Sequence, residues 1–128
     1  KKSKKYMRIK IIQDARDLSF QEFYAYMISN KYFYLKEFGV GPKSPTKLPT
    51  TLMGLKDDPY RSLAWAVREA GGFTKLDIAF LEFFWADFFR ESGIRIESSS
   101  KDAINIALSK ALKLAKTPTA SHLPGYNP

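Results

Sequence analysis

The segment from Phe80 to Phe89 is the sequence feature that most limits how this chain can fold. If residues 74–91 form a helix, large apolar side chains lie on every side of it. These side chains are Leu76, Ile78, Phe80, Leu81, Phe83, Phe84, Trp85, Phe88 and Phe89. A helix that is apolar all round has to lie at the centre of a fold. Thr74 and Asp77 have the spacing of a capping box, which predicts a central helix from Thr74 to about Glu91.

Three further helices are expected around it, each preceded by a residue that can cap its first turn. Their expected limits are Ser19 to Asn30, Asp58 to Gly71, and Ser99 or Ser100 to about Lys116, which gives a helical core over residues 19–116. The first carries an aromatic stripe, which we expect to face the core rather than to stack on nucleic-acid bases. Residues 39–56 contain three prolines and three glycines and are predicted to form a long irregular connection.

Residues 6–12 alternate between apolar and basic side chains, as in a half-buried strand. No second convincing strand is found in the sequence, and a single strand leaves its backbone hydrogen-bonding groups unpaired. We therefore expect a partner strand from outside these residues, either from a missing N-terminal half or from another subunit. The expected fold class is α+β and mostly α, an edge strand followed by about four helices. The 128 residues would then form a single or a partial domain.

The formal net charge of +8 is concentrated at the ends of the chain. Residues 1–10 carry six basic groups and no acid, whereas residues 11–100 are nearly balanced. Residues 1–5 form a basic arm, which is either a solvated tail or a contact for phosphate groups. The candidate phosphate-binding residues are Lys4, Lys5, Arg8 and Lys10.

Composition excludes several classes of site. The chain has no cysteine and one histidine, His122, so disulfides, thiolate zinc sites and multi-histidine metal sites are excluded. No apolar run reaches the length of a membrane span, and the basic start leads into no long apolar stretch. We expect a cytoplasmic protein without membrane contact.

Residues 117–128 are rich in turn residues and are expected to form a C-terminal strap that docks on the helices.

One group of residues resembles an active site. It combines carboxylates and arginines from the two central helices: Asp57, Asp58, Arg61, Arg68, Glu82, Asp87 and Arg90. Such a group could serve as an acid–base pair or as an oxygen-only site for a divalent metal. A structural role explains the group better, with Asp58 as a helix cap, Asp87 paired to Arg90, and Glu82 paired to an arginine of the preceding helix.

Two long stretches resemble the ParB-like nuclease family. They are Asp57 to Phe73 (DDPYRSLAWAVREAGGF) and Phe80 to Arg90 (FLEFFWADFFR), and the ending from Leu123 to Tyr126 is also similar. The resemblance implies the helical part of a ParB/sulfiredoxin-like fold, in a family associated with hydrolysis of DNA and a superfamily that binds nucleotides or DNA. It also marks Asp58, Arg61, Arg68, Glu82, Asp87 and Arg90 as a polar cluster within the family-like segments.

The chain departs from that family at its catalytic signature, an aspartate followed by paired histidines, which this sequence does not contain. No catalytic residue can be carried over, and whether the chain is an enzyme stays open. We expect the carboxyl-terminal part of a nuclease, whose complete form could use a divalent metal, with a nucleic acid or nucleotide as partner. The alternatives are a non-catalytic nucleic-acid-binding module, a self-assembly module, and a nucleotide-binding enzyme.

Overall fold

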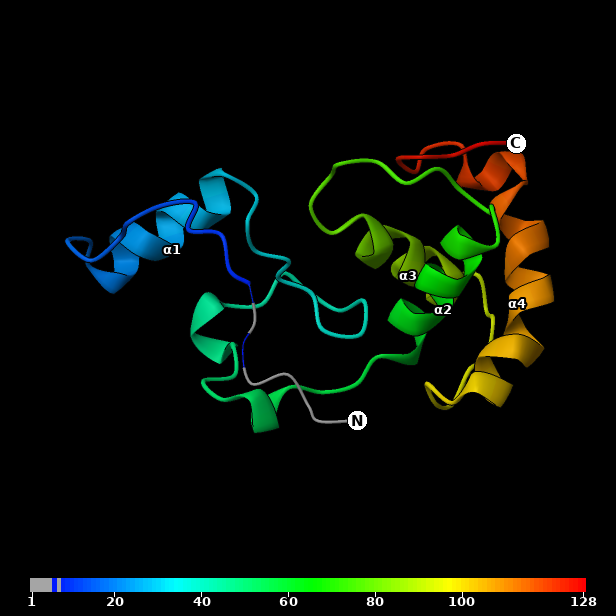
Figure 1. Ribbon diagram of the computed structural model, residues 1–128, viewed down its shortest axis with the longest axis horizontal. Coiled ribbons are helices and arrows are strands. Elements are labelled where there is room, and N and C mark those ends of the chain that lie inside the picture. The colour runs from blue at the N-terminus through cyan, green and yellow to red at the C-terminus, as the bar shows by residue number, and fades with distance from the viewer. Residues whose placement is uncertain (1–5, 7) are drawn as a thin grey trace. The chain divides into compact units, whose positions relative to one another are not determined.

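The computed structural model describes Tyr6 and residues 8–128, which divide into two compact units between Phe33 and Tyr34. The helices are α1 (Phe20–Ser29) in the first unit and α2 (Pro59–Glu69), α3 (Leu81–Glu91) and α4 (Lys101–Ala115) in the second (Figure 1). Single 3-10 turns lie at Pro45–Lys47, Leu52–Gly54 and Pro118–Ala120. The described chain is therefore mostly helical, with four α-helices and no sheet. None of these helices combines the length and apolar content needed to cross a membrane.

Helix α1 begins with the predicted capping box. The Ser19 hydroxyl accepts a hydrogen bond from the Glu22 backbone N–H at 3.2 Å, and the Glu22 carboxylate accepts one from the Ser19 N–H at 2.8 Å. The helix ends at Asn30, as predicted. Its aromatic stripe does not face a core, because no α1 residue is buried and Phe20 is 79% exposed.

The hydrophobic core of the second unit lies between α2, α3 and α4, and α2 contacts both of the other helices. Trp85 and Phe89 of α3 are fully buried, so this helix supplies the largest core side chains, as the sequence predicts. Helix α4 presents buried alanines four residues apart, at Ala107, Ala111 and Ala115. Such small side chains on one face allow close approach of its backbone to α2.

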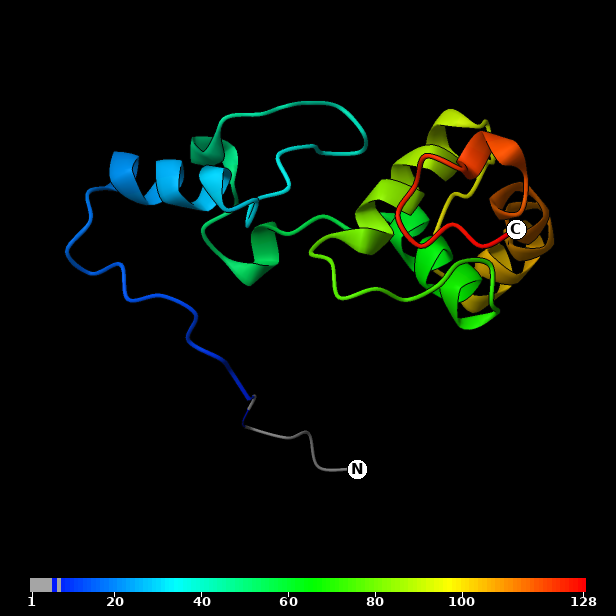
Figure 2. The ribbon, with the colours of Figure 1, turned by 90° about the horizontal axis from the view of Figure 1, so that it is seen from above.

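The C-terminal segment runs beside α3 (Figure 2) and is held by backbone hydrogen bonds. The Trp85 indole N–H donates to the Pro124 carbonyl at 2.9 Å, and the Thr74 N–H donates to the Gly125 carbonyl at 2.7 Å. Gly125 has a φ of +79°, and a Cβ there would lie 2.3 Å from the Thr74 carbonyl oxygen. Glycine is therefore required where the strap touches this loop.

The predicted start of the central helix is wrong. Helix α3 begins at Leu81 rather than at Thr74, because Phe80 has a left-handed backbone with a φ of 64°. The residues before it form an exposed loop, and Leu76 is 39% exposed. The Thr74 backbone is bonded to the C-terminal strap instead of starting a helix. A local capping pattern was thus overridden by a tertiary contact.

The strand expected over residues 6–12 is not formed in the structure. Arg8 to Ile12 have no strand assignment, and Ile9 and Ile11 are 79% and 80% exposed. Met7 and residues 1–5 lie outside the described part of the chain. The physical reason is the one the sequence suggests: the described residues offer no second strand to satisfy these backbone groups.

The two tryptophans give a direct test of this core. Replacing Trp85 by Phe removes the hydrogen bond to Pro124 and leaves a void beside Phe73, whose ring stacks on the indole at 4.2 Å. We expect the free energy of unfolding to fall by about 1.5–3 kcal/mol, measured by urea denaturation followed by circular dichroism.

Trp65→Phe is the matched control, because the Trp65 side chain is 55% exposed. It should change the free energy of unfolding by less than about 0.5 kcal/mol. Equal effects of the two substitutions would contradict the packing described here.

Candidate functional site

The carboxylates and arginines predicted from the sequence divide into two ion-paired groups on α2 and α3. One group joins Asp58, Asp87 and Arg90, and the other joins Arg68 to Glu82. Arg61 lies on α2 between Asp58 and Arg68 in sequence, and its side chain forms no hydrogen bond to another described residue.

Arg90 is the centre of the first group. One of its terminal nitrogens lies 2.5 Å from Asp58 Oδ2 and the other lies 2.5 Å from Asp87 Oδ1. Asp58 also caps α2, because its Oδ1 accepts the Tyr60 backbone N–H at 3.1 Å. The Arg90 guanidinium lies 4.7 Å from the centre of the Tyr60 ring. Arg90 thus fastens the first turn of α2 to the last turn of α3.

Asp87 is the buried charged residue of the described chain, at 8% exposure. Its second oxygen accepts a hydrogen bond from the Tyr34 hydroxyl, and the Lys36 ammonium lies 3.9 Å away. Burial of the ring and this bond to Asp87 raise the pKa of Tyr34 well above its ordinary value, so the phenol stays protonated and donates. A buried carboxylate needs such partners to offset its lost hydration.

Gly39 brings the loop that follows Tyr34 against the same group. Its φ is +79°, and a Cβ at this position would lie 3.1 Å from the Arg90 guanidinium and 3.5 Å from Asp87 Oδ1. The lack of a side chain allows the loop backbone to pack directly on the Asp87–Arg90 pair.

The second group contains Arg68, which bonds Glu82 on α3 through one terminal nitrogen and Glu69 through the other, at 3.1 Å. The predicted pairing of Glu82 with an arginine of the preceding helix is confirmed, as is the pairing of Asp87 with Arg90. Every cluster carboxylate on α3 is therefore engaged by a guanidinium.

The remaining candidates lie apart from these groups. Asp57 accepts a hydrogen bond from the Ser99 hydroxyl at 2.6 Å. His122 is exposed, and its ring approaches the Phe88 ring at 6.1 Å rather than a carboxylate. Arg8 and Lys10 are exposed, and Lys4 and Lys5 lie outside the described residues.

The cluster does not fit a divalent metal. Asp58, Glu82 and Asp87 each give oxygens to arginine, and no group of three metal-ligating side chains occurs among the described residues. Oxygen-only sites need several carboxylate or carbonyl oxygens that converge on one point. What the arrangement does physically is balance buried charge and fix α2 against α3.

Sequence reasoning missed Tyr34 and Gly39 as parts of this cluster. Tyr34 lies in the irregular segment after α1, and its ring packs on Phe83 with centres 4.6 Å apart. Nothing within residues 31–41 marks these positions, because their partners are about fifty residues further along the chain.

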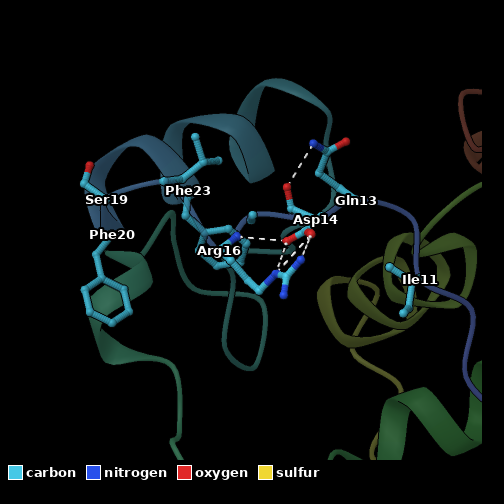
Figure 3. A pocket seen from close by; sticks show the side chains of 9 residues that line it. Ile11, Gln13, Asp14, Arg16, Ser19, Phe20 and Phe23 are labelled. Carbon is cyan, nitrogen blue, oxygen red and sulfur yellow. Dashed lines mark hydrogen bonds and ion pairs between the residues drawn. The ribbon is translucent and has the colours of Figure 1, made fainter.

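An open hollow in the first unit is a separate feature (Figure 3). It is lined by Ile11, Gln13, Asp14, Ala15, Arg16, Leu18, Ser19, Phe20 and Phe23. Its ion pair joins Arg16 and Asp14 at 2.7 Å, with side chains 86% and 57% exposed. An ion pair so exposed contributes little to the stability of the fold.

Comparison with known proteins gives two findings. Residues 1–91 match the family described as "Putative ParB-like nuclease". The structure is similar to the crystal structure of protein Atu1540 from Agrobacterium tumefaciens, with a TM-score of 0.75 and 39% sequence identity. The match covers 87% of this chain and 56% of that one, so this chain spans little more than half of that relative's length. No curated protein gives a significant match.

The bridging role of Arg90 can be tested with Arg90→Lys, which keeps the charge but replaces two guanidinium contacts by one ammonium. We expect a loss of about 2 kcal/mol in the free energy of unfolding, measured by urea denaturation, because one carboxylate is left poorly paired. The control is Arg95→Lys at an exposed position. A loss for Arg90→Lys no larger than that of the control would refute the bridge.

The raised pKa of Tyr34 predicts that the free energy of unfolding decreases at alkaline pH. Its pKa is higher in the folded state than in the unfolded chain, where it is about 10, so its contribution is complete below pH 10 and declines as pH rises further. Tyr34→Phe should lower the free energy of unfolding at pH 7 by about 1–2 kcal/mol and flatten the alkaline decline. Tyr6→Phe, at a side chain 90% exposed, should change neither quantity.

Proposed function

The chain belongs to the ParB-like nuclease family, and we propose from this premise that it forms the helical portion of a protein directed at nucleic-acid phosphodiesters. The observation that carries the proposal is the family match over residues 1–91. The likeness to Atu1540 over 87% of this chain supports the fold in which this portion takes part. In this proposal the helical portion completes the fold and contacts phosphate groups.

The hydrolytic residues of the family are proposed to lie outside the residues of this sequence. The family's aspartate and paired histidines are missing from this sequence, whose single histidine is the exposed His122. Asp58, Glu82 and Asp87 are held by arginines and are proposed to have structural roles. This chain by itself is then not expected to cleave nucleic acid.

Residues 6–12 are proposed to become an edge strand when a partner strand is present. Ile9, Ile11 and Ile12 are 79%, 80% and 58% exposed, which suits a segment that gains cover on pairing. The backbone of Arg8 to Ile12 forms no hydrogen bond within the described chain. Pairing with a sheet would satisfy these groups and complete a ParB/sulfiredoxin-like fold.

The same exposed segment favours one alternative, self-assembly through the strands of two copies. A monomer by light scattering over a range of protein concentrations would exclude this alternative and leave the first arrangement standing. The basic residues Lys4, Lys5, Arg8 and Lys10 flank or lie within this segment, so the proposal also places a phosphate contact there.

Binding of a fluorescent single-stranded oligothymidylate tests the proposal. The chain should bind with an affinity that falls as salt rises, since neutralised phosphates release counterions. Replacing Lys4, Lys5, Arg8 and Lys10 together by Gln should reduce the slope of log K against log salt by about 2–3. In the same preparations Mg²⁺ or Mn²⁺ should produce no cleavage above a protein-free control.

The matched control replaces four exposed lysines elsewhere by Gln: Lys75, Lys101, Lys110 and Lys113. This control variant removes the same charge and should leave most of the slope of log K against log salt unchanged. Equal slopes for the two variants would refute the basic arm as a contact. Cleavage that is lost in Glu82→Gln or Asp87→Asn would overturn the structural role given to these carboxylates.

A further inference from the structure

Arg61 differs from the other two arginines of the α2–α3 cluster. The terminal nitrogens of Arg68 and Arg90 are taken by carboxylates, whereas the Arg61 side chain has no ion pair and no hydrogen bond to any residue that the structure describes. Its guanidinium carbon lies 3.3 Å from the centre of the Phe83 ring. Its Nε atom is buried without a hydrogen-bond partner, as is the Nε atom of Arg68.

This environment is energetically unusual for a charged side chain. The residue is half-buried, and burial lowers the pKa of Arg61, although an arginine stays charged in a protein. A buried donor without an acceptor costs about 1–3 kcal/mol. Stacking on Phe83 fixes the plane of the guanidinium and leaves its edge, with the N–H donors, free to meet a planar or tetrahedral anion.

The charged groups around Arg61 are mostly paired with one another. Arg90 bonds Asp58 and Asp87, the Lys36 ammonium also lies near Asp87, and the Glu91 carboxylate helps to raise the pKa of Tyr34. The Tyr34 phenol stays neutral, because burial and its bond to Asp87 raise its pKa. Both aspartates are bonded to Arg90, and Arg61 forms no ion pair with a described residue.

An exposed aromatic side chain lies on the same face of α2 as Arg61. Trp65 is one turn beyond Arg61 on α2, a spacing that places two side chains on the same face of a helix. Its side chain is 55% exposed, in contrast to the fully buried Trp85. A guanidinium for the phosphate and a neighbouring ring for the base is the combination by which proteins hold single-stranded nucleic acids.

We propose that the Arg61–Trp65 face of α2 binds one nucleotide of a single strand, with Arg61 donating to the phosphate and Trp65 stacking on the base. This inference rests on the proposed function and deepens it, since it assigns a contact on the helical core that is separate from the basic arm. It also explains why Arg61, unlike its neighbours, has no carboxylate partner within the described chain.

The test measures binding of the fluorescent oligothymidylate by the full 128-residue chain and its variants. Arg61→Gln should weaken binding about tenfold, the loss of one charge-assisted hydrogen-bonded contact. Arg61→Lys should retain only part of the affinity, because an ammonium cannot donate two parallel hydrogen bonds as a guanidinium does. The control is Arg95→Gln, which removes one exposed positive charge and should change the affinity less than about twofold.

Two further readouts separate binding from folding. The Arg61 side chain donates no hydrogen bond within the described chain, so Arg61→Gln should leave the melting temperature nearly unchanged. The oligothymidylate should quench tryptophan fluorescence through Trp65, and Trp65→Phe should abolish this quenching, since Trp85 is buried. Inorganic phosphate should compete weakly and without quenching, because it has no base.

The outcomes distinguish this inference from the proposed function. Arg61→Gln and Arg95→Gln with equal affinities would overturn the inference, while a loss of binding in the four-residue arm variant would still support the arm. The reverse pattern would support Arg61 and refute the arm. Polyglutamate that binds as tightly as oligothymidylate would mark a carboxylate site and refute the nucleotide, and no binding by the unchanged chain would refute both.

Discussion

The bridge from Asp58 through Arg90 to Asp87 is the interaction on which the arrangement of the second unit depends. Asp87 is 8% exposed, so its carboxylate stays in this position only while charged and polar partners replace its water. Arg90 supplies that partner and ties it to the residue that caps α2. Tyr34 supplies a second, from the loop that enters the unit. One buried charge thus fixes two helices and a loop.

The apolar packing works together with this bridge on the opposite side of α3. Trp85 stacks on Phe73 and donates to the Pro124 carbonyl, so the C-terminal strap closes over the core through both packing and a hydrogen bond. Helix α2 contacts both α3 and α4, and its Arg68 side chain is paired with Glu82 of α3. The C-terminal strap therefore covers the apolar core at Trp85, and arginine–carboxylate ion pairs join α2 to α3 elsewhere in the unit.

Membership of the nuclease family suggests that the acidic residues of the cluster could be catalytic, whereas their ion pairs indicate a structural role. The family match directs attention to conspicuous acidic side chains, yet Glu82 and Asp87 are neutralised within the chain. The terminal nitrogens of Arg61 have no carboxylate partner among the described residues, in contrast to those of Arg68 and Arg90, and the exposed Trp65 lies one turn further along α2.

The sequence by itself determined the features that depend on contacts within one helical turn. The caps at Ser19, Asp58 and Ser100 are where the pattern places them, because a capping side chain bonds the backbone two or three residues away. The Asp87–Arg90 pair was predictable in the same way, from its spacing of three residues, whereas the Arg68–Glu82 pair joins two helices.

Only the tertiary structure decided where α3 begins, which residues complete the cluster, and whether residues 6–12 pair. The Thr74 backbone is bonded to Gly125, and Phe80 adopts a left-handed conformation, so a valid local cap is unused. Tyr34 reaches Asp87 across more than fifty residues, which no local pattern can reveal. A strand is defined by its neighbour, and its alternation predicts the capacity to pair but not the partner.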